Sequence, residues 1–183
     1  MTELERNHLD EGKQAYNEGD YETAVEAFRQ AREVWRQVGD KYAEADALMS
    51  EGLAHLRMKR YKEAEAALRE ALEIFSQIEA PEGQATAMGN LGTLLYKLGR
   101  YDEAIDYLDQ AAVLFAQIGE QRREMESLQM LSRIFLQKRD WLNALLVYDR
   151  LLQKIPPREL KPSQKLLRFL NKIFFRIVGV QAG

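Results

Sequence analysis

The sequence predicts an all-α fold, a right-handed superhelical α-solenoid of about four helix-turn-helix repeats followed by a C-terminal amphipathic helix. Two observations lead to this fold class. A phrase of similar residues recurs every 40 residues, and within each copy the apolar residues are spaced by three, four and three positions. Those spacings place the apolar residues on one face of an α-helix. A face of this kind is buried only when successive helix pairs stack on one another.

The repeated phrase predicts the second helix of each pair. Its copies read "GDYETAVEAF", "KRYKEAEAAL", "GRYDEAIDYL" and, more faintly, "RDWLNALLVY", starting at residues 19, 59, 99 and 139. Each copy has an aromatic residue, then an alanine three positions later, then a large side chain four positions after that. The alanine lets a neighbouring helix approach closely, while the large side chain fills the space beside it.

The segment before each phrase predicts the first helix of the pair. Gly12, Gly52, Gly92 and Ser132 recur twelve residues ahead of the alanine. A small residue inside a helix marks a close helix crossing. Short turns are predicted at "EGD", "MKR", "LGR" and "QKR". The expected repeats cover about residues 2–38, 40–79, 81–119 and 120–155.

Composition limits the class of protein. Of the 183 residues, 46% are hydrophobic and 30% are charged, which suits a folded chain with a solvated surface. The sequence has neither a signal-peptide pattern nor a run of eighteen apolar residues, so we expect a cytoplasmic protein. The absence of cysteine excludes disulfides, thiolate nucleophiles and thiolate metal ligands.

The repeats resemble the tetratricopeptide repeat (TPR) family, in its long 40-residue form, as in kinesin light chain and its bacterial relatives. The family's small, aromatic and two alanine positions are matched by "NLG" at 90–92, Tyr101, Ala104 and Ala111, and the resemblance covers about residues 5–155. It implies a repeat domain over 1–155. The expected function is that of a bacterial protein-binding scaffold, adaptor or assembly factor. Its partner, a peptide or helix of unknown identity, would lie in the concave groove.

The resemblance places that groove along the first helices. Asn90 matches the asparagine with which relatives hold the backbone of an extended peptide. The alternative is that these positions are ordinary solvated surface. The expected groove residues are Lys13, Tyr16, Asn17, Met49, Leu53, Arg57, Asn90, Thr93, Tyr96, Lys97, Gln129 and Arg133.

An enzyme is the rival class, and the sequence argues against it. The two histidines, His8 and His55, stand at unrelated positions of the repeat, and no glycine-rich phosphate loop is present. The carboxylates that begin the second helices, such as Asp102, are expected to face water. We therefore expect no catalytic residues, no metal site and no cofactor.

Residues 156–183 differ from the rest and are expected to form a proline-led linker and a cationic amphipathic helix. They contain six basic residues and one acidic residue, a charge of +5, which leaves −8 on residues 1–155 of a chain with net charge −3. Ser163 is the predicted N-cap. The residues expected to dock this helix on a membrane or partner are Lys165, Arg168, Lys172, Phe174, Phe175 and Arg176.

The role of this helix has three alternatives. It could cap the solenoid and cover Leu142 and Leu146, which stand where earlier copies are mostly polar. Its basic face could attach the protein to an anionic membrane surface, making it a peripheral assembly protein of the inner membrane. It could also dock into the groove of its own chain or of a second copy, giving a homodimer through the C-terminal end. Nucleic acid is not an expected partner, because the body of the chain is acidic.

Overall fold

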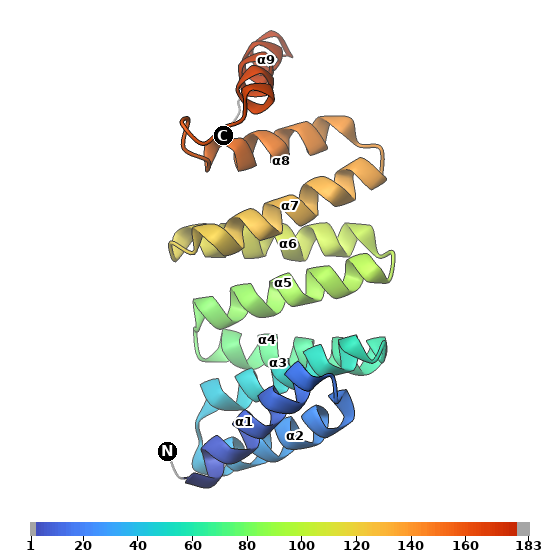
Figure 1. Cartoon of the computed structure of the whole chain (residues 1–183), viewed down its shortest axis with the longest axis vertical. Coiled ribbons are helices and arrows are strands. Elements are labelled where there is room, and N and C mark those ends of the chain that lie inside the picture. Colours follow the sequence, from blue (N-terminus) through green and yellow to red (C-terminus); the bar gives the residue numbers. More distant parts are fainter. Residues whose placement is uncertain (1–2, 179–183) are drawn as a thin grey trace. The chain divides into compact units, whose positions relative to one another are not determined.

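The computed structural model describes the backbone of residues 3–178 and the side chains of residues 8–173. Over this range the chain is entirely helical apart from turns, which confirms the predicted all-α class (Figure 1). The helices are α1 (Glu3–Glu18), α2 (Tyr21–Val38), α3 (Lys41–Arg57), α4 (Tyr61–Gln77), α5 (Pro81–Lys97), α6 (Tyr101–Gln117), α7 (Gln121–Gln137), α8 (Trp141–Gln153) and α9 (Pro162–Val178).

The helices form two compact units. Residues 1–100 hold α1 to α5, and residues 101–183 hold α6 to α9. Within each unit every helix packs against the next helix in the chain, and α3 also contacts α5. This serial packing of helix pairs is the arrangement of a TPR-like solenoid.

The turns from α1 to α8 share one backbone motif. One residue in each of these turns has positive φ, and the following N–H donates to the carbonyl oxygen five residues earlier, as from Asp20 to Ala15 and from Arg60 to His55, both at 2.9 Å. This is the hydrogen bond of the Schellman motif. The positive-φ residues are Gly19, Gly39, Lys59, Glu79, Gly99, Gly119 and Arg139.

Aspartate begins three of the helices. The side chains of Asp20, Asp40 and Asp140 accept hydrogen bonds from backbone N–H groups three residues later. These bonds satisfy donors that have no partner within the first turn of a helix.

Close helix crossings occur where the sequence predicts them. A Cβ atom on Gly12 would lie 2.6 Å from Cε1 of Phe28, and one on Gly52 would lie 3.0 Å from Cγ of Leu68. The glycines therefore let α1 approach α2 and let α3 approach α4, which confirms the predicted crossings at these two residues.

Gly83 forms a third close crossing, which the 40-residue pattern does not reveal. A Cβ atom there would lie 2.2 Å from Cδ1 of Phe75, so α5 meets α4 through a residue without a side chain. The matching positions in neighbouring copies hold Ala43 and Arg123. Arg123 lies over the ring of Phe115 instead, at 5.8 Å from its centroid.

The start of α9 differs from the prediction. The helix begins at Pro162, so Ser163 lies inside its first turn and is not the N-cap. Proline suits the first helical position because it lacks the N–H that would have no partner there. The side chain of Gln164 accepts the N–H of Lys161 at 2.9 Å, as in half of a capping box.

Gly83→Ala tests the α4–α5 crossing. We expect it to lower the free energy of unfolding by about 1–3 kcal/mol, because the added methyl group overlaps the Phe75 ring. Gly89→Ala on the same helix is the matched control, since a Cβ atom there would meet no atom of another helix within 4 Å. That change should stabilise by about 0.5–1 kcal/mol through helix propensity. Denaturant unfolding measures both, and equal stability of the two variants would contradict the crossing.

Candidate functional site

A pocket in the first unit brings together four of the predicted groove residues, Lys13, Tyr16, Asn17 and Leu53. Its volume is about 200 Å³. Phe28 of α2 and Ser50 of α3 complete the lining. The pocket therefore lies where the first two helix pairs meet.

Helical spacing explains how these residues converge. On α1, Tyr16 and Asn17 follow Lys13 by three and four residues, and on α3, Leu53 follows Ser50 by three. Each set therefore shares one helix face. Phe28 is buried and supplies an apolar floor, whereas Lys13 and Asn17 are exposed. An apolar interior with a few polar groups at its edge is typical of ligand-binding pockets.

Arg57 supports one wall of this pocket. Its guanidinium lies 5.9 Å from the centroid of the Tyr16 ring and 5.5 Å from that of Tyr21, and the two rings meet edge to face at 5.4 Å. Its Nε donates to the Tyr21 hydroxyl at 3.1 Å, which raises the pKa of Arg57 above its ordinary value. The predicted groove residue Arg57 therefore positions Tyr16.

Asp46 is a candidate binding residue that the sequence analysis missed. It lies on α3 one turn before Ser50 and is half-buried. Burial raises the pKa of Asp46 above its usual value, and the positive charge of Lys13 offsets part of this shift. The sequence did indicate a polar position here, because Thr86 and Glu126, which stand at the same place in the next two repeats, are also polar.

The other predicted residues of the first unit lie along α3 and α5. Met49 packs against a core cluster that includes Phe75. Asn90, Tyr96 and Thr93 are half-buried, and the Thr93 hydroxyl donates to the carbonyl of Gly89 at 2.9 Å. Lys97 is exposed at the end of α5.

In the second unit the predicted groove residues lie on α7. Gln129 is exposed and lines a pocket of about 380 Å³ together with Arg122 and Met125 of the same helix. Arg133 is exposed one turn further along the helix.

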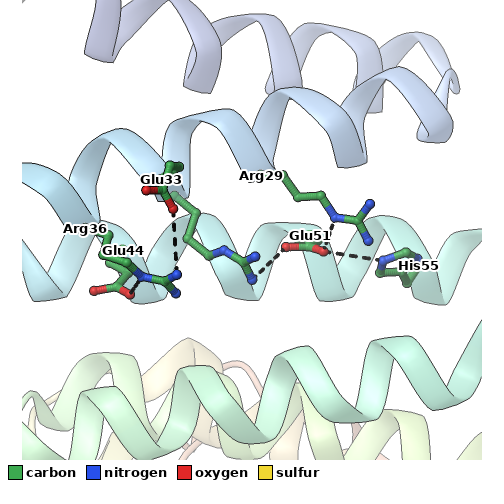
Figure 2. A network of polar contacts seen from close by, with 7 residues as sticks. Arg29, Glu33, Arg36, Glu44, Glu51 and His55 are labelled. Atoms are coloured by element: carbon green, nitrogen blue, oxygen red, sulfur yellow. Dashed lines mark hydrogen bonds and ion pairs between the residues drawn. The ribbon is translucent and has the colours of Figure 1, made fainter.

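Several carboxylates away from the starts of the second helices are buried, and the sequence analysis did not predict them. Glu51 of α3 is 4% exposed and pairs with two arginines of α2, at 2.8 Å from Arg29 Nε and 3.2 Å from a terminal nitrogen of Arg32 (Figure 2). His55 Nε2 lies 3.6 Å from the same carboxylate. These contacts join α2 to α3, so the cluster serves packing. Among the described side chains, no group of three or more histidines and acids could hold a metal ion.

Glu44 is a second buried carboxylate at the same helix junction (Figure 2). Its oxygens accept hydrogen bonds from Arg36 Nε at 2.8 Å and from Lys41 Nζ at 2.7 Å. Burial alone would raise the pKa of Glu44, but the hydrogen bonds and positive charges of Lys41 and Arg36 together outweigh it, and the pKa lies below its usual value.

A larger pocket in the second unit, of about 570 Å³, lies among α6, α7 and α8, and sequence reasoning missed it. Leu146 is half-buried and contributes to its lining. Leu142 remains 43% exposed, so the expectation that the C-terminal helix covers this leucine is wrong. The lining consists of Ile105, Asp106, Asp109, Gln110, Leu131, Phe135, Asn143, Leu146, Val147 and Arg150.

The docking residues expected on α9 are partly described. Lys165 and Lys172 are exposed and Arg168 is half-buried, whereas the side chains of Phe174, Phe175 and Arg176 lie outside the described residues. Asn171 of α9 turns towards α8: it is 2% exposed and its Nδ2 donates to Asp149 Oδ1 at 3.3 Å.

The sequence was compared with models of protein families and with curated proteins. A family model described as tetratricopeptide repeat matches residues 9–77 and 83–153. A search of curated proteins gave no match.

Solved structures that share the fold at low sequence identity include the following three. A Rap protein complexed with Competence and Sporulation Factor gives a TM-score of 0.73 at 22% identity, and the match covers 84% of this chain but only 44% of the Rap chain. BtubC (BKLC) from P. vanneervenii gives 0.58 at 17% identity, covering 98% and 86%. A Podosopora anserina protein described as a putative kinesin light chain with nearly identical TPR-like repeats gives 0.73 at 16%, covering 98% and 90%.

The two carboxylates Asp46 and Glu44 should respond to pH in opposite senses. A raised pKa in the folded state means that ionised Asp46 disfavours folding above that pKa, so Asp46→Asn should raise the melting temperature at pH 7, with the gain fading towards pH 3. A lowered pKa means that ionised Glu44 favours folding, and this stability is lost as pH falls. Glu44→Gln should therefore lower the melting temperature at pH 7, by a difference that also shrinks with acid. Thermal melts across this range measure both, and a pH-independent offset in either variant would contradict the assignment.

Proposed function

Because the chain belongs to the tetratricopeptide repeat family, we propose that it is a non-catalytic scaffold, an adaptor or assembly factor, that binds a peptide or helix along its first helices. The observation that carries the proposal is the pocket between α1 and α3, where four predicted groove residues meet. Repeat proteins use extended surfaces of this kind to bind their partners.

The chemistry of the pocket favours an extended segment with an apolar side chain. Tyr16, Phe28 and Leu53 offer apolar surface for one such side chain. Asn17 and Ser50, at the edge, can hydrogen-bond to a peptide backbone. Lys13 supplies a positive charge for an acidic group of the partner, and the nearby Asp46 limits how strongly it attracts one.

The binding surface would continue along α5. Asn90 and Tyr96 are half-buried there and Lys97 is exposed, so this helix offers both hydrogen-bonding and charged groups. A segment longer than one residue could therefore contact α3 and α5, which pack against each other.

The Rap structure supports a binding role for such repeats, since that protein is described in complex with Competence and Sporulation Factor. The chain spans less than half of the Rap chain, so the support concerns the repeat fold and its capacity to hold a partner.

Peptide selection on the full chain tests the proposal and requires no named partner. Peptides would be selected from a random library, and their affinity measured by calorimetry for wild type and for Lys13→Ala/Leu53→Ala. We expect the double substitution to weaken binding at least about tenfold, because it removes apolar contact and a charge from the pocket.

Lys62→Ala/Ile78→Ala is the matched control, because it removes an exposed lysine and a partly exposed aliphatic residue from α4 and its end in the same unit. Its affinity should equal that of wild type. Equal binding by the pocket variant and the control would place the peptide site elsewhere and refute the proposed groove.

A further inference from the structure

Four large apolar residues of α9 are exposed on one side of the helix. Leu166, Phe169, Leu170 and Ile173 are 58%, 59%, 49% and 43% exposed. Their spacing of three, one and three residues places them on one helix face. A contiguous apolar face of this kind on a folded protein marks a surface that another body covers.

A buried polar pair fixes this orientation. Asn171 donates to Asp149, which is 4% exposed and also accepts from Gln153 at 2.8 Å. Rotating α9 to turn its apolar face inward would leave Asn171 and part of Asp149 without partners, which is costly for buried groups. The outward direction of the apolar face is therefore built into the packing of α8 and α9.

Positive charge borders the exposed face. Lys165 precedes Phe169 by four residues and Lys172 follows it by three, so both lysines lie beside Phe169 on the helix surface, and both are exposed. Arg168 is half-buried on the same helix. A surface that suits this helix is apolar where it meets the exposed apolar side chains and negatively charged where it meets the two lysines.

We propose that α9 is an interfacial helix that attaches the protein to an anionic lipid surface. Leu166, Phe169, Leu170 and Ile173 enter the boundary between headgroups and acyl chains, while Lys165 and Lys172 contact the anionic headgroups. The helix lies in the plane of the membrane surface. No helix among the described residues has the length and apolar character needed to cross a bilayer.

Charge argues against a second copy as the occupant. Two α9 helices packed face to face would bring four exposed lysines to the edges of one seam, where like charges repel. The pocket among α6, α7 and α8 could attract the basic α9 of a second copy, because it carries Asp106 and Asp109. Asp109 already pairs with Arg150 at 3.0 Å, however, which reduces the negative charge that the pocket offers.

Vesicle sedimentation of the full chain tests the proposal. We expect binding to vesicles of phosphatidylcholine with about one third phosphatidylserine, and little binding to phosphatidylcholine alone. Lys165→Gln/Lys172→Gln should weaken binding to the anionic vesicles about 30-fold. Phe169→Gln/Leu170→Gln should weaken it at least about tenfold through the loss of inserted apolar area.

Two matched controls should bind as wild type does: Lys59→Gln/Lys62→Gln for charge, and Val113→Gln/Leu142→Gln for exposed apolar surface. Circular dichroism melts check that every variant folds. Absence of wild-type binding to anionic vesicles would overturn the proposal, as would equal losses in the controls. A dimer in light scattering that Phe169→Gln/Leu170→Gln dissociates, with no vesicle binding, would assign the face to a second copy and overturn it too.

Discussion

The first unit depends on one steric constraint, which is that three of its pairs of successive helices meet through a glycine. Gly12 faces Phe28, Gly52 faces Leu68 and Gly83 faces Phe75, each at a distance that a Cβ atom would make too short. This constraint also shapes the candidate site. Phe28, whose ring fills the space above Gly12, is the floor of the pocket between α1 and α3. Helix packing and the binding surface therefore share a side chain, and changing one changes the other.

Much of the fold could be predicted because its determinants are periodic. The copies of the phrase located the helices and turns, and Gly12 and Gly52 located two crossings. The crossing at Gly83 could not be predicted in this way, because the neighbouring copies hold Ala43 and Arg123 at the same position. A contact that occurs in one copy gives no periodic pattern. The burial of Glu44 and Glu51 could not be predicted for a related reason. Each carboxylate is buried because arginines of another helix pair with it, and the residue type alone does not show which carboxylates have such partners.

The site was predictable to the extent that it follows the helix face. Lys13, Tyr16, Asn17 and Leu53 could be chosen by register, and they line one pocket. Arg57 was chosen by the same register, but it lies over the Tyr16 and Tyr21 rings and is not part of the pocket lining. For α9 the amphipathic pattern was clear, yet the pattern does not say which side faces the protein. The buried pair of Asn171 and Asp149 decides that, and such a pair depends on the meeting of two helices distant in sequence.

The uniform turns give the chain a modular length. Positive-φ residues recur every 20 residues from Gly19 to Arg139, and each is followed by the same hydrogen bond, whether or not the residue is glycine. One helix and its turn are thus a fixed 20-residue module, and a pair is 40. Duplicating a complete pair inside the array would keep every later helix in phase, whereas inserting a single residue within a helix would rotate the residues that follow it by about 100° on the helix face. A change in length by whole pairs therefore preserves the phase of the remaining helices, whereas other changes in length do not.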